Sequence, residues 1–310
     1  RFPEAVHADW SGTQQNPRIL GGLLPATGGH EQMAGIDVGV CLPRSAMQAA
    51  AGGDLQGLQA DIRLHLSMDD EQTVINDGVL LVSGSRIETM GPADEVEIPD
   101  DYRVIAFEEH WLLPGIVEAH NHSSAGGWSD LNDMVYPTNS GLRVLDNIMP
   151  NNPRLKKAQA GGVTVILFLP GSGTNLSGFA ALMKTGGDTL EDVLIRFPGA
   201  LKVAQGGNPE RRGGDLGLGS MGMNAILRRE LEDGKRYCEA WDAYEKGERT
   251  TRPPFNPRLE HYRKVFHREI PVLVHTQGSL LVAQTLRMFR DELDLWVIVG
   301  HGTFNGSELA

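Results

Sequence analysis

The stretch "LPGIVEAHNHSS", residues 113–124, decides how the chain is interpreted. A short apolar segment follows Pro114 and Gly115 and ends in two histidines, His120 and His122, with one residue between them. Side chains at positions i and i+2 of a strand point to the same face of a sheet. The stretch therefore predicts a strand that presents two imidazoles side by side at its carboxyl end.

The segments after this strand repeat the order of strand and helix. Predicted strands cover 115–120, 163–171, 270–275 and 295–301, and predicted helices cover 153–162, 221–246, 257–269 and 280–293. Residues 179–185, 188–198 and 200–205 continue the alternation. The run "VTVILFLPG" is continuously apolar and rich in β-branched residues, which suits a parallel strand that is buried on both faces. Repeated units of this kind predict a parallel α/β sheet or barrel.

The helix at 221–246 has the clearest period of 3.6 residues. Its expected buried face consists of Met223, Ile226, Leu227, Leu231, Tyr237, Cys238, Trp241 and Tyr244. Gly234 interrupts this face and is expected to be a weak point of the helix. Cys238 is interpreted as a core residue, and a disulfide between Cys41 and Cys238 remains the alternative.

Four histidines stand at the carboxyl ends of predicted strands. They are His120, His122, His275 and His301. A (β/α) barrel builds its active site at this end of its strands, and converging imidazoles are suitable ligands for Zn²⁺. The alternative for each is a structural histidine held by hydrogen bonds. The remaining histidines are interpreted as structural or surface residues: His7, His30, His65, His110, His261 and His267.

The amino-terminal part has a different texture. Residues 1–54 show no sustained period and predict an extended arm. Short, partly alternating apolar segments then follow at 60–68, 78–91 and 102–115. They predict short antiparallel strands joined by tight turns.

Composition excludes several classes of partner. The formal net charge of −12 argues against nucleic acid and anionic membrane surfaces as partners, since both need a basic face. The longest apolar run, 163–169, is too short to span a membrane. The sequence begins at Arg1 without a methionine. A removed export signal is one explanation and a proteolytic or artificial boundary is another, and we favour an exported protein, periplasmic or secreted, over a cytoplasmic one.

The stretch "HWLLPGIVEAHNH" resembles the first barrel strand of the amidohydrolase superfamily, with its apolar strand, Pro-Gly and His-x-His pattern. Residues 77–115 resemble that superfamily's amino-terminal strands, which form half of a small β-sandwich. Residues 160–172 resemble its second-strand segment. Within the superfamily the imidazolonepropionase-like group is most similar, through "ALKVAQGGNPERRGG" and the helix that follows it. The resemblance covers roughly 58–310.

The resemblance implies a hydrolase that cleaves a C–N bond, in an amide or cyclic amide of a small molecule. It implies one or two ions of Zn²⁺ or another divalent transition metal. His120 and His122 would hold the more buried metal, while His275 and His301 would hold the second metal or orient the substrate. A carboxylate or carboxylated lysine would bridge the metals. Lys202 is the candidate, and a lysine that only packs its stem beside the barrel is the alternative.

Two departures from the family pattern matter. The family segment commonly has a glutamate at the position of Gly207. The sequence also stops at Ala310, before the last two barrel strands, the aspartate that would act as general base and the returning strands of the sandwich. We therefore expect an incomplete TIM-type (β/α) barrel, with an arm at 1–54, a partial β-sandwich at 55–113 and the first six barrel strands at 114–310.

The missing strands are expected on a second polypeptide, which makes the protein a hetero-oligomer; a truncated sequence is the alternative. Arg211 and Arg212 are candidates to bind a substrate carboxylate, or else form a salt bridge in an exposed loop. The rival functional interpretation is a catalytically weakened or structural subunit. A third is a metal-binding module without hydrolysis.

Overall fold

The computed structural model describes residues 56–66, 73–84, 86–127, 131–210 and 219–302, with backbone alone for 56–66 and 106–111. The expected arm at 1–54 lies outside these residues. The chain divides into two compact units. The first comprises residues 1–118, 153–166 and 184–193, and the second comprises 119–152, 167–183 and 194–310. The domain boundaries expected from the sequence stay predictions.

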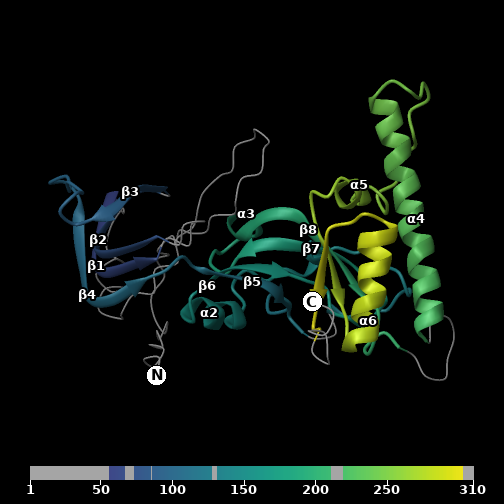
Figure 1. The fold of residues 1–310 in the computed structure, drawn as a ribbon, viewed down its shortest axis with the longest axis horizontal. Coiled ribbons are helices and arrows are strands. Elements are labelled where there is room, and N and C mark those ends of the chain that lie inside the picture. The colour runs from purple at the N-terminus through teal and green to yellow at the C-terminus, as the bar shows by residue number, and fades with distance from the viewer. Residues whose placement is uncertain (1–55, 67–72, 85, 128–130, 211–218, 303–310) are drawn as a thin grey trace. The chain divides into compact units, whose positions relative to one another are not determined.

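A four-stranded sheet lies in the first unit (Figure 1). Its strands are β1 (Gln56–Leu66), β2 (Val74–Ser83), β3 (Arg86–Pro92) and β4 (Arg103–Leu112), in the spatial order β3-β2-β1-β4. The pairs β1–β2 and β2–β3 are antiparallel, as expected, but β1 and β4 are parallel. A sandwich needs two packed sheets. The partial sandwich therefore stays a prediction.

A six-stranded sheet carries the strands expected from the histidine-rich half of the chain. They are β5 (Ile116–Asn121), β6 (Val163–Phe168), β7 (Leu176–Lys184), β8 (Leu194–Ala204), β9 (Val272–His275) and β10 (Val297–Gly300). They lie in the order β10-β9-β8-β7-β6-β5. All four residues of β9 are buried, as are five of the six residues of β6. This continuous burial explains why these strands read as unbroken apolar runs.

The strand directions correct one expectation. β5 runs parallel to β6, because Ile116 donates to the Gly162 carbonyl at one end and Leu169 donates to the Asn121 carbonyl at the other. β8, β9 and β10 are parallel to one another, but β7 is antiparallel to β8. The helix between β7 and β8, α3 (Leu190–Val193), has only four residues. A simple strand–helix alternation is therefore wrong between β6 and β8.

The sheet curls into a barrel-like arrangement. β5 and β10 are its opposite edges in the strand order. Nevertheless, the ring centroids of His120, on β5, and His301, just after β10, lie 4.5 Å apart. A flat sheet would separate its edge strands by five inter-strand spacings of about 4.8 Å each. The right-handed twist of the sheet brings these two ends together instead.

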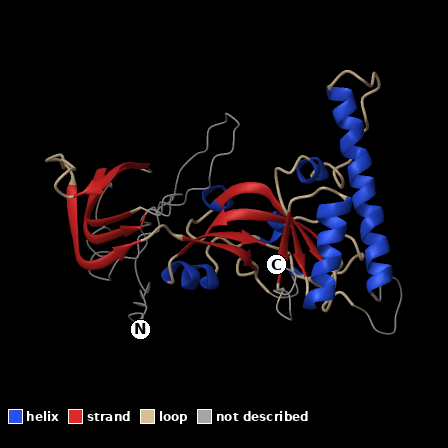
Figure 2. Cartoon of the chain, viewed as in Figure 1, coloured by secondary structure: helices blue, strands red, loops and turns tan. Residues whose placement is uncertain are grey.

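Helices pack beside this sheet (Figure 2). They are α2 (Pro153–Ala160), α4 (Ser220–Glu245), α5 (Tyr262–Phe266) and α6 (Gly278–Thr285), with a π-helical turn at Leu286–Glu292 after α6. The predicted helix at 221–246 is confirmed almost residue for residue by α4. The predicted helix at 257–269 is confirmed only over its centre, because turns precede α5.

The buried face of α4 matches the predicted stripe, with Ile226 and Tyr244 partly buried at its margins. Gly234 has a role different from the expected weak point. A Cβ atom at this position would lie 2.5 Å from Cγ of Tyr262, a fully buried side chain. Glycine is therefore required because α4 approaches the Tyr262 ring more closely than any side chain permits.

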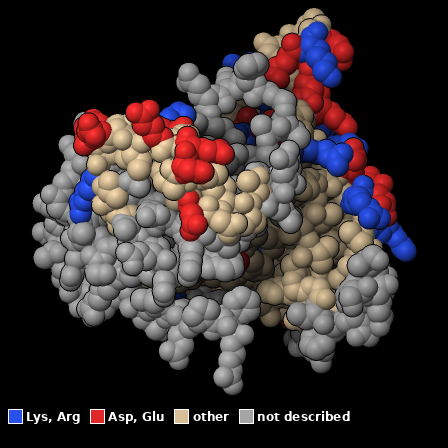
Figure 3. Space-filling view, turned by 60° about the vertical axis from the view of Figure 1, so that its left-hand side comes forward, with Lys and Arg blue, Asp and Glu red and all other residues tan. Residues whose placement is uncertain are grey.

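The solvent face of α4 carries both signs of charge, which Figure 3 shows along the outer side of the molecule. Lys235 pairs with Glu239 at 4.0 Å, and Arg236 with Glu232 at 3.9 Å. These i,i+4 pairs favour an exposed helical surface. Among the described helices, none is long and apolar enough to cross a membrane.

Candidate active site

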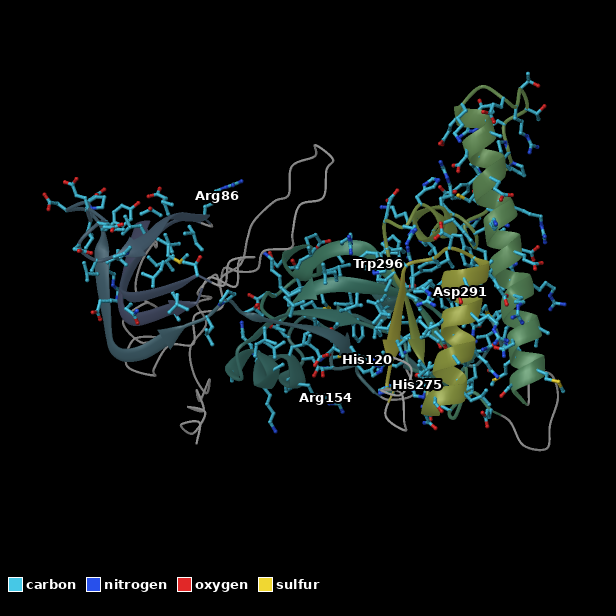
Figure 4. All side chains as sticks on the ribbon, in the orientation of Figure 1. Arg86, His120, Arg154, His275, Asp291 and Trp296 are labelled. Atoms are coloured by element: carbon cyan, nitrogen blue, oxygen red, sulfur yellow. The ribbon has the colours of Figure 1, made fainter. Side chains whose placement is uncertain are left out.

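The carboxyl ends of four strands place five predicted side chains together. His120 and His122 come from β5 and its end, Lys202 from β8, His275 from the last position of β9, and His301 from the residue after β10. Figure 4 shows the labelled His120 and His275 at the same end of the sheet. The structure thus brings together every strand-end histidine that the sequence singled out.

The imidazole rings contact one another. The ring centroid of His120 lies 5.1 Å from that of His122 and 4.5 Å from that of His301. The rings of His275 and His301 are also 4.5 Å apart. His301 adopts a left-handed backbone with φ of 62°, which is uncommon for a residue with a side chain. Such conformations persist where the surrounding structure enforces them, and functional sites are a frequent location.

Hydrogen bonds fix the orientation of two rings. Nδ1 of His122 lies 2.9 Å from the Leu169 carbonyl oxygen, so this nitrogen carries a proton and donates it. The Nε2 atom of His122 then keeps its lone pair. Nδ1 of His275 lies 3.0 Å from Oγ of Ser172. Both partners follow β6, and neither was found from the sequence.

One ring nitrogen has no hydrogen-bond partner. Nε2 of His275 is buried and unsatisfied. A buried polar atom without a partner costs about 1–3 kcal/mol, so such atoms are rare and call for an explanation. An imidazole nitrogen with a free lone pair is the form that ligates a metal. Binding of a metal ion by Nε2 of His275 would therefore supply the partner that this atom lacks.

The electrostatics favour neutral imidazoles. Burial, followed by the nearby Lys202 ammonium, lowers the pKa of His120 to about 3. Burial lowers the pKa of His275 to about 4 and also lowers the pKa values of His122 and His301. Each of these shifts favours the neutral imidazole, which is the form that metal binding requires.

Lys202 is fully buried in the middle of this group. Its Nζ lies 3.3 Å from Nε2 of His120, and burial lowers its pKa to about 7. A substantial part of the amine is therefore neutral at physiological pH. The side chain does more than pack its stem beside the barrel, because its nitrogen faces a histidine of the candidate site.

Other predicted residues lie elsewhere. His261 packs edge-on against Phe179 and Phe197, with ring centroids 5.1 Å away in each case, which fits its structural interpretation. Cys238 is buried, as expected of a core residue. Cys41, Arg211, Arg212, His7 and His30 lie outside the described residues, as do the side chains of His65 and His110.

The ligand atoms of the strand-end histidines are spread more widely than a single compact metal site. In the described part of the chain, one group of three Cys, Asp, Glu or His ligand atoms lies within 4.8 Å of one another, and it consists of Cys238, Asp242 and His267. The strand-end histidines therefore do not form a compact group of three ligand atoms in this structure.

Two curated proteins are similar to parts of this chain. No family model matches the chain. The chain is 32% identical over 106 residues to the amidohydrolase tasK of Hapsidospora irregularis. That match covers 32% of this chain and 11% of that protein. It is 33% identical over 55 residues to the imidazolonepropionase of Pseudomonas syringae pv. tomato. That match covers 18% of this chain and 14% of that protein.

The fold is also similar to that of a solved amidohydrolase structure. An amidohydrolase of Thermotoga maritima MSB8 superimposes with a TM-score of 0.70 at 24% identity, over 79% of this chain and 64% of that one. Together the comparisons support the amidohydrolase superfamily. The expected resemblance is confirmed. The chain spans less than a sixth of the length of either curated relative, so its activity as a whole protein is a matter for proposal.

Proposed function

We propose that the chain belongs to a metal-dependent hydrolase that cleaves a C–N bond, in an amide or cyclic amide of a small molecule. The observation that carries the proposal is the convergence of four neutral imidazoles from β5, β9 and β10, one with an unsatisfied buried nitrogen. The names of the amidohydrolase relatives support the reaction class.

The donor set suits a divalent transition metal such as Zn²⁺. Imidazole nitrogen is among its preferred ligands, and burial keeps the rings in the ligating form. His120 and His122 would hold one ion, and His275 and His301 a second ion or the substrate. A bound metal lowers the pKa of water and polarises a carbonyl group. Ser172 and the Leu169 carbonyl orient His275 and His122, as outer partners do in metal sites.

Gly207 cannot easily be replaced by the glutamate of the family pattern. Its backbone has φ of 72°, and a Cβ atom would lie 2.8 Å from Nε2 of Gln277. The bridging role would therefore fall to Lys202. Its neutral amine can attack the carbon of CO₂, forming an N–C bond while one C=O π bond breaks. Loss of the amine proton then leaves a carbamate whose oxygens can bind cations.

The general base stays a prediction, as an aspartate supplied from outside this sequence. One observation favours the rival proposal of a weakened or structural subunit, namely that glycine stands at position 207, where the family pattern has a glutamate and where φ of 72° disfavours a residue with a side chain. A subunit of that kind would keep the fold without turning over substrate.

Metal content tests the proposal first. Protein purified without chelator should contain one or two equivalents of zinc or another transition metal by elemental mass spectrometry. The natively purified protein, together with any polypeptide that copurifies with it, should hydrolyse members of a panel of cyclic amides and N-acyl amino acids. Stripping the metal should abolish hydrolysis, and adding Zn²⁺ back should restore it. Metal-free protein that still hydrolyses these compounds would contradict the metal-dependent mechanism.

A further inference from the structure

A second group of metal-type side chains lies away from the strand ends, between α4 and α5. Cys238 and Asp242 are one turn apart on α4, and His267 caps the carboxyl end of α5. Their ligand atoms all lie within 4.8 Å of one another. The pattern i and i+4 on one helix with a third ligand from a neighbouring element places sulfur, oxygen and nitrogen at one point.

The three atoms form a triangle of the size that a tetrahedral ion requires. Sγ of Cys238 lies 3.7 Å from Oδ2 of Asp242 and 3.5 Å from Nε2 of His267. Nε2 and Oδ2 are 3.0 Å apart. Zinc–ligand bonds of about 2.3 Å to sulfur and about 2.0 Å to nitrogen and oxygen, at tetrahedral angles, give edges of roughly 3.3–3.6 Å. The observed edges scatter around these lengths.

The surroundings supply an orienting group and an open side. Oε1 of Glu269 lies 3.8 Å from Nδ1 of His267, on the side of the ring away from the cluster. A carboxylate on that side of the ring would become the outer partner of a metal-bound imidazole if the distance shortened to that of a hydrogen bond. Cys238 is buried, whereas the side chains of Asp242 and His267 are partly exposed, so water can reach a fourth position.

The nearby cations have anionic partners of their own. Arg263 pairs with Glu245 at 2.6 Å and with Glu260 at 3.7 Å, and Lys264 pairs with Glu269 at 3.7 Å. Their charges are therefore largely offset. The remaining local charge at the cluster comes from Asp242 and, on binding, the thiolate.

A nucleophilic cysteine explains the cluster less well. Burial, followed by the charge of Asp242, raises the pKa of the Cys238 thiol to about 12, whereas reactive cysteines have lowered values. In a catalytic triad the carboxylate and the nucleophile use opposite ring nitrogens. Here Asp242 and Cys238 both face Nε2 of His267, and Glu269, on the opposite side of the ring, lies 3.8 Å from Nδ1, which is beyond hydrogen-bond distance.

We propose that Cys238, Asp242 and His267 bind one Zn²⁺ ion, with water as the fourth ligand, and that this ion fastens α4 to the turn that leads into β9. The site is separate from the strand-end histidines and does not depend on the hydrolase proposal. Because α4 and α5 share a packed core, the ion acts as a clamp across an interface that already exists.

Cobalt(II) is the probe that distinguishes the two sites. It replaces zinc in N, O and S sites, and a sulfur ligand adds a thiolate charge-transfer band in the near ultraviolet. The metal-stripped full chain should develop this band on titration with Co²⁺, and Zn²⁺ should displace it. Cys238→Ser should lose the band and about one equivalent of bound metal, while Cys41→Ser should keep both. The strand-end histidines contribute no sulfur, so their cobalt cannot mimic the signal.

Asp242→Asn provides a second variant that preserves side-chain shape. It should weaken Co²⁺ binding at this site at least tenfold, while Asp233→Asn, on the exposed face of the same helix, should leave it unchanged. Circular dichroism checks that each variant is folded. The absence of a charge-transfer band in the parent chain, or a band that survives in Cys238→Ser, overturns the proposal.

Discussion

The strand-end histidines and the α4–α5 cluster are both sets of ligand-type side chains, but their metal-free states differ. At the strand ends the imidazoles face one another and a buried lysine, and Nε2 of His275 has no hydrogen-bond partner. Between the helices, Cys238, Asp242 and His267 satisfy one another through mutual hydrogen bonds. Without a cation, the unsatisfied nitrogen of the first group lowers the stability of the fold, whereas the second group leaves no such atom unsatisfied.

This difference teaches how each site is built. The barrel-like sheet imposes the first group, because the carboxyl ends of β5, β8, β9 and β10 lie at the same end of the sheet and alternate residues of each strand face the same side. The second group depends on how closely two helices pack, which Gly234 permits. A preorganised site gives up little further entropy on binding, whereas a self-satisfied site must exchange its internal hydrogen bonds for metal bonds.

The largest expected effect comes from removing a strand-end ligand. His120→Ala should lower metal affinity at the strand ends by more than about 100-fold, because even outer partners of metal ligands contribute about 10–100-fold. Hydrolysis should fall to background together with the metal content. Elemental mass spectrometry and an amide hydrolysis assay measure the two losses.

The matched control is His261→Ala. That ring packs against Phe179 and Phe197, so metal content and hydrolysis should remain at the parental level. Equal losses of metal and of hydrolysis in the two variants would contradict the assignment of the strand-end site.

Lys202 gives the next effect, on stability. Burial lowers its pKa from 10.5 to about 7, so between these values the unfolded chain binds more protons than the folded chain. The free energy of unfolding of the metal-free protein should therefore rise as pH increases from about 7 to about 10.5, by up to a few kcal/mol. Below pH 7 the full penalty of the buried charge is present.

Lys202→Met keeps the stem and removes the titration. Urea unfolding of both proteins across this pH range should show a slope in the parent chain that is absent from the variant. Identical pH profiles would mean that the amine is hydrated in solution. In the metal-loaded protein, the same variant should lose any ion that the carbamate bridges.

The smallest effect concerns the support of the α4–α5 cluster. Gly234→Ala places a methyl group against the Tyr262 ring and should lower the free energy of unfolding by about 1–3 kcal/mol, despite the better helix propensity of alanine. Thermal or urea unfolding measures this change. Gly222→Ala, on the exposed face of the same helix, should instead be neutral or raise stability by up to about 1 kcal/mol. A stabilising Gly234→Ala would refute the close packing.

Sequence patterns predicted the strand ends and α4 well. His120, His122, His275 and His301 were found because each ends a run of apolar residues, and the periodic face of α4 was recognised because its helix is long. These signals are local, so tertiary packing did not overrule them.

What the sequence did not reveal depends on contacts between distant segments. Nothing local distinguishes β7, which turns back antiparallel, from a strand of a parallel barrel, since both are short apolar runs. The role of Ser172 cannot be predicted from its neighbours in sequence, because its hydrogen-bond partner, His275, is 103 positions away. His267 is interpreted from the sequence as a structural or surface residue because it lies between charged residues, and its partners Cys238 and Asp242 lie on another helix.

The meeting of β5 and β10 has a consequence for the order of folding. His120 and His301 are 181 positions apart in sequence, so bringing them together closes a long loop. The conformational entropy of that loop is lost before the contacts at the strand ends can form. The mouth of the sheet should therefore assemble after the local β6–β7–β8 hairpins have formed. A cation bound there would stabilise an arrangement expected to form late in folding, so it should slow unfolding more than it speeds folding.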